Sequence, residues 1–128
     1  MKKLLLLLLA IPFLAATNYA PDFSGITAAM TKGDATQLSK FFDAKVDLSV
    51  LGNETKLDKL GATGEVKRFF STNAATTFQL MHQGISKDQV SHYGIGQLSA
   101  GGKSFQVFVY LRDTGGQFLI QELRIEKK

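Results

Sequence analysis

The hydrophobic pattern of the chain changes its period near residue 76. Between Phe23 and Phe70, apolar residues recur mainly at helical spacing, whereas from Thr76 onward apolar and polar residues alternate. Helical spacing places apolar side chains on one face of a helix, and alternation places them on one face of a strand. The pattern therefore predicts mainly helices in the first part of the domain and strands in the second.

Two short helices are predicted at the start of the domain. Apolar residues at helical spacing form the first, and Gly33 stands where it would end. Asp34 precedes Gln37 by three residues, an arrangement in which each side chain accepts a hydrogen bond from the backbone N–H of the other residue. A second helix is therefore expected to follow at once. Its apolar side is predicted to consist of Leu38, Phe41 and Phe42.

A strand pair and a third helix complete the first part. Alternating apolar residues from Val46 to Val50 predict a half-buried strand, and Gly52 forms a turn into a short partner strand at residues 54–57. Asp43 and Asp47 flank the second helix and this strand, and we interpret them as capping or turn residues. The third helix is expected to present one apolar face, formed by Ala62, Val66, Phe69 and Phe70.

Four strands are predicted in the second part, at residues 76–85, 89–98, 104–112 and 117–126. Short loops join them, so they are expected to form an antiparallel meander. One face of the third of these strands carries Phe105, Val107, Val109 and Leu111, and the other carries Gln106, Phe108, Tyr110 and Arg112. Because the second face also holds aromatic residues, we expect it to be buried against a partner subunit.

Two glycines, Gly94 and Gly96, share one face of the neighbouring strand. Their missing side chains would permit either sharp curvature of the strand or the close approach of another backbone. We prefer curvature, because irregular or glycine-containing strands are a common way to bend a sheet.

The predicted order of elements resembles the cone-shaped fold of the nuclear transport factor 2-like superfamily, a cystatin-like fold. Three stretches are also similar to a family of secreted bacterial proteins classed as a domain of unknown function: FSGITAAMTKGDATQLSKFFDAKVDLSVLG, LMHQG and GGQFLIQELRIEK. The resemblance covers residues 21–128. It implies an α+β fold in which N-terminal helices pack in the concave face of a strongly curved, mainly antiparallel sheet.

The resemblance does not select a reaction. The superfamily includes isomerases, dehydratases and epoxide hydrolases, together with many non-enzymatic binding or dimerising modules, and a shared fold does not imply a shared function. Many of its domains pair through the outer face of the sheet. The resemblance therefore implies a homodimer as one kind of partner.

The first twenty residues have the order of a secretory signal peptide. Lys2 and Lys3 form a basic head, residues 4–16 form an apolar stretch with six consecutive leucines, and small residues follow. This apolar run is shorter than the roughly 20 residues that a membrane-spanning helix needs, and Pro12 interrupts it. We expect cleavage between residues 16 and 20, and export to the periplasm or the medium.

Cleavage would leave a single domain, residues 21–128, without a stable membrane anchor. The sequence contains no cysteine, so neither disulfides nor a lipid on the usual lipoprotein cysteine is expected. Removal of Lys2 and Lys3 from the 15 basic side chains leaves 13 against 11 acidic ones. This near balance, without a basic stripe, gives no reason to expect nucleic-acid binding.

Two histidines are considered as functional groups. His82 is in phase with Phe78 and Leu80, so it is a candidate to point into the cone, where it would act as a general base or a hydrogen-bond donor. The ordinary interpretation is a histidine at the margin of the sheet. His92, in phase with Val90, is a weaker candidate because no carboxylate lies at a spacing that would pair it with this histidine.

Glu122 is a candidate base as well. In the resembled superfamily, a carboxylate or histidine inside the cone works with tyrosine or carboxylic-acid donors, and here Tyr93 or Tyr110 would stabilise a developing oxyanion. The ordinary interpretation is a cross-strand ion pair between Glu122 and Arg112. No spacing establishes that these groups converge.

Motifs for other chemistry are not apparent. The sequence offers no metal-ligand spacing, no glycine-rich loop between a strand and a helix, and no nucleophile elbow. We therefore expect no metal and no cofactor.

The sequence favours a non-enzymatic module that binds a small apolar ligand, a peptide or a second copy of itself. The alternative is a small hydrolase, isomerase or dehydratase that acts on an apolar substrate inside the cone. An enzyme needs at least two polar groups that meet in an enclosed pocket of roughly 300 Å³ or more. A binding module can instead fill its cone with Phe41, Phe69 and Phe70, and a largely filled cone is our expectation.

Overall fold

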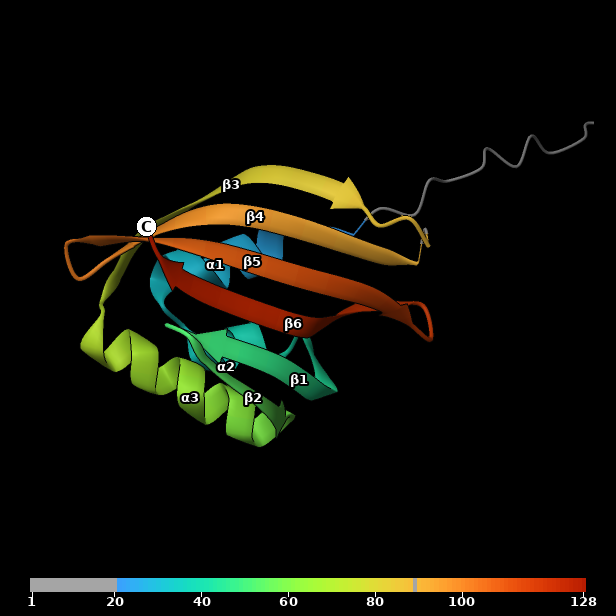
Figure 1. Cartoon of the computed structure of the whole chain (residues 1–128), viewed down its shortest axis with the longest axis horizontal. Coiled ribbons are helices and arrows are strands. Elements are labelled where there is room, and N and C mark those ends of the chain that lie inside the picture. The colour runs from blue at the N-terminus through green and yellow to red at the C-terminus, as the bar shows by residue number, and fades with distance from the viewer. Residues whose placement is uncertain (1–20, 89) are drawn as a thin grey trace, which may run out of the picture.

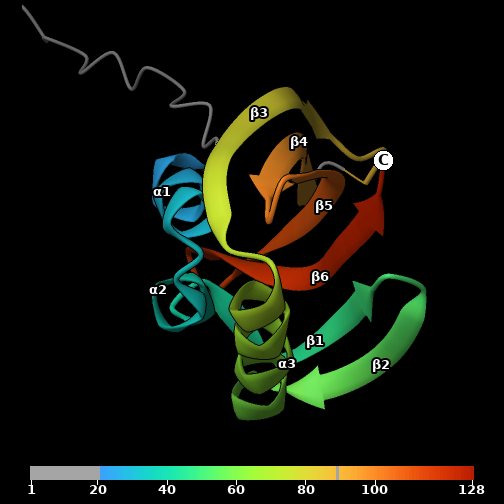
Figure 2. The ribbon, with the colours of Figure 1, turned by 90° about the vertical axis from the view of Figure 1, so that its left-hand side faces the viewer.

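A six-stranded, curved sheet with helices on its concave side makes up the described part of the protein (Figure 2). The computed structural model describes residues 21–88 and 90–128, so the predicted signal peptide lies outside the described residues (Figure 1). In chain order the elements are α1 (Ser24–Lys32), α2 (Ala35–Ser39), β1 (Phe42–Val50), β2 (Asn53–Asp58), α3 (Lys59–Thr72), β3 (Ala75–Ile85), β4 (Ser91–Ala100), β5 (Lys103–Thr114) and β6 (Gln117–Lys127). The α+β architecture predicted from the sequence is confirmed.

The strands lie in the order β2-β1-β6-β5-β4-β3. Strands β3 to β6 form the predicted antiparallel meander, and β1 pairs with β2 in an antiparallel hairpin. The two parts of the sheet join where β1 pairs with β6 in parallel. Because β6 is the last strand of the meander, this contact brings the two ends of the domain together and leaves β2 and β3 as the edge strands.

The helix boundaries follow the local signals in the sequence. Gly33 ends α1 in a left-handed conformation with φ +63°, which glycine adopts without strain. The Oδ1 atom of Asp34 accepts a hydrogen bond of 3.0 Å from the backbone N–H of Gln37, as predicted for the start of α2. In the same way, Asp58 Oδ1 accepts a hydrogen bond of 2.8 Å from the N–H of Gly61 at the start of α3.

The predicted extent of α2 was wrong, because this helix has only five residues. Phe42 begins β1 instead, where it is fully buried opposite Ile120 of β6, and burial in the sheet outweighs its helical spacing. Asp43 and Asp47 consequently lie within β1 rather than at a cap or turn. Asp43 Oδ2 accepts a hydrogen bond of 3.0 Å from Nε2 of Gln121 on β6.

Aromatic side chains occupy the space that Gly94 and Gly96 leave on the concave side of β4. A Cβ atom at position 94 would stand 2.8 Å from Cε1 of Phe23, just before α1. At position 96 it would stand 2.3 Å from Cζ of Phe78 and 2.9 Å from the carbonyl oxygen of Gln79, both on β3. The close approach at these glycines is therefore mainly that of aromatic rings, with one backbone contact, in a sheet that is also curved.

The concave face is packed with large apolar side chains. Phe69 of α3 lies against Phe70 and against Phe105 of β5, with ring centroids 5.5 and 5.1 Å apart in edge-on geometry. Phe69 and Phe70 are buried and Phe41 packs against the same core, as expected for residues that fill the cone. The largest fully buried side chains are Phe42, Phe105, Ile26, Met30, Leu38, Leu98, Leu111, Ile120, Leu123 and Ile125, with Val46 and Val66.

Candidate functional site

Side chains on the outer face of the sheet, away from the helices, align in rows across the strands, because paired residues project from the same face. The first row runs from β3 to β2 through Gly84, Tyr93, Tyr110, Glu122, Asp47 and Lys56. The second row runs through His82, Ile95, Phe108, Arg124, Ser49 and Glu54. Of the five residues that the sequence analysis considers as functional groups, four lie in these two rows, namely His82, Tyr93, Tyr110 and Glu122.

His82 lies exposed on the outer face of the edge strand β3, which agrees with the ordinary interpretation of a histidine at the margin of the sheet and not with a place inside the cone. Phe78 and Leu80 do face the core. The pairing with β4 then shifts between Leu80 and His82, which inserts one extra residue into the alternation. Beyond this irregularity, His82 pairs with Ile95 and projects to the opposite side of the sheet from Leu80.

Glu122 lies beside the two tyrosines, as the sequence grouped them, but on the outer face. Its side chain is 32% exposed, and its Oε1 atom accepts a hydrogen bond of 3.0 Å from Nη2 of Arg124. The predicted partner, Arg112, pairs instead with Leu119, because the β5–β6 register shifts after Tyr110. The predicted cross-strand ion pair is therefore wrong, and Glu122 pairs instead with Arg124, two residues along its own strand.

Three rings form an aromatic cluster on β4 and β5, defined here as Tyr93, Phe108 and Tyr110. The ring centroids of Tyr93 and Phe108 are 6.2 Å apart with an angle of 15° between planes, and those of Phe108 and Tyr110 are 6.2 Å apart at 22°. All three side chains are half-buried. The tyrosine ring of residue 93 extends over β3, since a Cβ atom at Gly84 would stand 2.3 Å from its Cζ. The cluster thus offers nearly parallel rings to a partner.

A charged network lies next to the aromatic cluster on β6 and β2, and consists of Arg124 with three glutamates. Arg124 stands 3.0 Å from Glu122, 3.6 Å from Glu126 and 3.8 Å from Glu54, measured between nitrogen and oxygen atoms. The hydrogen bond from Arg124 to Glu122 is the main reason why the guanidinium pKa is raised above its ordinary value. These ion pairs are partly exposed, so water screens them and they stabilise the fold only weakly.

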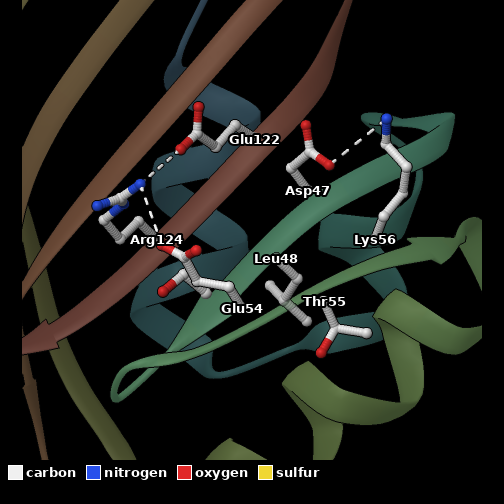
Figure 3. Close-up of a pocket in the computed structure, with 8 residues that line it drawn as sticks. Asp47, Leu48, Glu54, Thr55, Lys56, Glu122 and Arg124 are labelled. Atoms are coloured by element: carbon white, nitrogen blue, oxygen red, sulfur yellow. Dashed lines mark hydrogen bonds and ion pairs between the residues drawn. The ribbon is translucent and has the colours of Figure 1, made fainter.

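Three members of the network, Arg124, Glu122 and Glu54, line a hollow between β6, β1 and β2 (Figure 3). Its volume is 340 Å³. Glu122 and Glu54 point toward Arg124 from opposite sides, while Asp47 faces Lys56, 3.8 Å away. A neighbouring hollow of 430 Å³ is lined by Gln106, Phe108, Glu122, Arg124 and Glu126, and so connects the network with the aromatic cluster. The surface combines hydrogen-bond donors and acceptors with exposed ring area.

Within residues 21–88 and 90–128, no group of three or more histidine, cysteine or acidic residues is placed to hold a metal ion. In the same residues, no helix combines the length and apolar character needed to cross a bilayer.

His92 is buried in the structure, a position that the sequence analysis did not predict. It is 7% exposed on the concave face, where its ring meets Phe118 edge-on at a centroid distance of 4.9 Å. A signal was present, because counting back from Leu98 in steps of two through the glycines places His92 on the core side. In the described part of the chain, the buried polar side chains are Ser49, Asn73, Ser91 and His92, and none is a carboxylate.

Comparison with known proteins places this architecture in a family. Residues 23–126 match the family model described as Domain of unknown function (DUF4783). A crystal structure of a DUF4783 family protein from Bacteroides ovatus is 34% identical, with a TM-score of 0.77 over 82% of this chain and 94% of that chain. A DUF4783 family protein from Bacteroides uniformis is 31% identical, with a TM-score of 0.76 over 81% and 94%.

A more distant likeness shows the fold alone. A nuclear transport factor 2-like protein of unknown function from Shewanella baltica has a TM-score of 0.61 at 12% identity, over 83% of this chain and 87% of that chain. None of the curated proteins compared with this chain matches it. The family model and the two Bacteroides structures together show that the chain belongs to the DUF4783 family, with the nuclear transport factor 2-like fold that its sequence resembles.

Proposed function

We propose that this protein is an exported, non-enzymatic interaction module that forms a homodimer through the outer face of its sheet. The observation that carries the proposal is the aromatic cluster of Tyr93, Phe108 and Tyr110, which stands half-exposed on the face opposite the helices. Rings in such a position lose water contact when a second surface covers them, which favours association.

The composition of the outer face is typical of a protein interface. Tyrosine, phenylalanine and arginine are enriched at the centres of interfaces, where a few of them carry most of the binding energy. Here Phe108 pairs directly across the strands with Arg124, and Ile95 lies on its other side. The charged residues Glu54 and Lys56 lie further out, on the edge strand β2, as expected for a polar rim.

The area of the outer face is sufficient for a dimer. Six strands spaced about 4.8 Å apart, with about ten residues each at about 3.3 Å per residue, present roughly 900 Å². A stable interface buries about 800 Å² on each partner. A small ligand would cover only a fraction of this face, so a macromolecular partner fits it better.

The symmetry of an isologous interface makes a second copy suitable as that partner. A two-fold axis close to Phe108 would place one aromatic cluster against the other, as in an isologous interface. The same rotation would bring together two mixed-charge networks, in which Arg124 of one copy can meet the carboxylates of Glu122 and Glu126 of the other. Each network contains one arginine and three glutamates, so these contacts would offset part of the negative charge that the two copies bring together.

The alternative function, a hydrolase, isomerase or dehydratase, is supported by one observation. His92 lies buried on the concave face, where a base would be shielded from water. The polar set that the sequence suggested for such a reaction, Glu122 with a tyrosine and His82, lies on the outer face instead. The homodimer accounts for more of these residues and is therefore the function that we propose.

Export rests on the order of residues 1–20, a basic head followed by an apolar stretch and small residues. Intact-mass measurement of the protein recovered from its own host tests this part. The expected mass corresponds to a chain that begins between residues 17 and 21 in the periplasmic or culture fraction. An uncleaved chain in the cytoplasm would contradict export and leave the dimer to be tested separately.

Sedimentation equilibrium of the Phe108→Ala variant tests the interface. We expect the unmodified chain to be a dimer and the variant to dissociate about 30-fold more readily, because a central aromatic residue contributes about 2 kcal/mol or more. The matched control is Phe118→Ala, which removes another half-buried ring but on the core side of β6, beside His92. An unmodified chain that stays monomeric, or a Phe108→Ala variant that dimerises normally, would contradict the proposal.

A further inference from the structure

The two edge strands of the sheet differ in how they are protected. β2 carries a charged side chain at every second position, namely Glu54, Lys56 and Asp58. β3 is eleven residues long and contains no lysine, arginine, aspartate, glutamate or proline. Charged residues and prolines are the usual means by which an edge strand avoids pairing with another chain. β3 therefore lacks the protection that β2 has.

The backbone of β3 is available on one side. In the described part of the chain β3 pairs with β4 only, and Figure 1 shows it along the upper edge of the sheet. The backbone groups on its free side need hydrogen-bond partners, which water or another extended backbone can supply. Backbone donors and acceptors with the spacing of a strand pair with another extended backbone better than with a compact ligand.

β3 pairs continuously with β4 in two stretches, residues 77–80 and residues 82–85. Register shifts lie between Ala75 and Thr77 and between Leu80 and His82. The N-terminal part packs beside α1, where Gly33 lies close to Ala75. The stretch of residues 82–85 is therefore the part of the edge best placed to accept another strand.

Exposed apolar side chains gather around the same stretch. Met81 is 53% exposed, Ile85 is 60% exposed, and Val90 in the following loop is 41% exposed. Tyr93 adds ring area from the outer face, because its ring extends over Gly84. An added strand would thus find apolar contacts for its side chains as well as backbone groups for hydrogen bonds.

We infer that residues 82–85 of β3 bind an uncharged, extended segment of a partner protein as an additional edge strand. Four regular residues suffice for a peptide, which needs only a few main-chain hydrogen bonds and nearby apolar contacts. They do not suffice for two whole domains, since a stable dimer buries about 800 Å² on each partner. The segment is uncharged because β3 has no charged side chain to pair with it.

Nuclear magnetic resonance titration of the isotope-labelled protein tests the site. The probe is the peptide Thr-Val-Thr-Val-Thr, acetylated and amidated so that it carries no charge. We expect saturable shifts of the backbone amides of residues 82–85, and about tenfold slower hydrogen exchange there when the free peptide reaches ten times its dissociation constant. The matched probe has the same side chains but N-methylated alternate peptide bonds, and it should cause neither effect because it lacks the donors.

A pair of protein variants locates the site within β3. Gln83→Lys places a charge inside the stretch of residues 82–85 and should weaken peptide binding about tenfold or more. Gln79→Lys makes the same change at an exposed position of the same strand outside that stretch, and should bind the peptide as the unmodified protein does. The amide spectrum of each variant shows directly whether it has folded.

Three results would overturn the inference. The first is that the unmodified peptide causes no shifts of the backbone amides, and the second is that the N-methylated peptide causes equal shifts. The third is that the protection of β3 against hydrogen exchange increases with protein concentration alone, which would identify a second copy as the occupant. The outer-face dimer is a separate claim, because Phe108→Ala changes a residue outside β3. If the outer-face dimer failed its test, peptide binding at the edge would be unaffected. If peptide binding failed its test, the outer-face dimer would be unaffected.

Discussion

The concave and outer faces of the sheet are made by the same strands but differ in what covers them. In β5, Phe105 and Val107 face the helices and are buried, whereas their neighbours Phe108 and Tyr110 face outward and remain half-exposed. The concave face is completed within one chain and supplies stability. The outer face keeps aromatic area that its own chain does not cover, which makes it the better place to look for function.

Truncating one phenylalanine on each face should give the largest difference. Phe105→Ala removes a fully buried ring and should cost about 3–5 kcal/mol of unfolding free energy, because it leaves a cavity. Phe108→Ala removes a half-exposed ring from the same strand and should cost about 1 kcal/mol, apart from its effect on association. Denaturant unfolding at a protein concentration that keeps the chain monomeric measures both.

Equal losses of unfolding free energy for the two variants would contradict the view that the concave face supplies stability and the outer face supplies association. In that case Phe108 would belong to the core of the monomer, and its weakening of a dimer would be a consequence of lost stability.

Substituting alanine for one glycine on each face should give an intermediate difference. At Gly96 the new Cβ meets the buried ring of Phe78 and a backbone oxygen, so we expect a cost of about 1–3 kcal/mol. At Gly84 it meets the far end of the Tyr93 ring, which can turn away on the outer face, so the cost should be below about 1 kcal/mol. Thermal unfolding with calorimetry compares the two variants directly.

The Gly84→Ala variant also has a local signature. The resonances of the Tyr93 ring should move, because that ring has to leave its place over β3. An unchanged ring together with a large loss of stability would show that the outer face is packed as rigidly as the core.

The loop between β3 and β4 belongs to neither face and should give the smallest effect. The hydrogen bond from the Ser86 hydroxyl, followed by that from the Val90 N–H, lowers the pKa of Asp88 below its ordinary value of 3.8. A carboxyl with a lowered pKa stabilises the folded state above its unfolded pKa, and this contribution disappears as the pH falls through the folded value. Asp88→Asn should therefore be less stable than the unmodified chain near neutral pH.

Unfolding midpoints measured from about pH 7 down to about pH 2 check this prediction. The difference between the two proteins should shrink in the acid range, where Asp88 is protonated in both states. A difference that stays constant over the whole range would show that the carboxylate charge contributes nothing.

Periodicity predicted the elements well but failed where the register shifts. The helix end at Gly33, the cap at Asp34 and the four-strand meander all follow from local signals that act over a few residues. The irregularity after Leu80 is not visible in the alternation of the sequence, and it places His82 on the outer face rather than inside the cone. A similar shift after Tyr110 changed which arginine pairs with Glu122.

The candidate residues were therefore grouped better than they were located. Tyr93, Tyr110 and Glu122 occur in one row, although no spacing in the sequence established that they converge. Which side of the sheet faces the helices depends on the packing of α1 and α3, and the aromatic content of both faces left the sequence without a clear polar side. The buried position of His92 was not predicted, although its phase with Leu98 would have indicated it.

Native mass spectrometry of the processed protein from its own host tests the central claim most directly. The account predicts a dimer whose mass is twice that of the processed chain, with no additional small molecule, and predicts that Phe108→Ala yields monomer. A monomer that carries a bound small molecule would contradict it, because the concave face rather than the outer face would then hold the functional site.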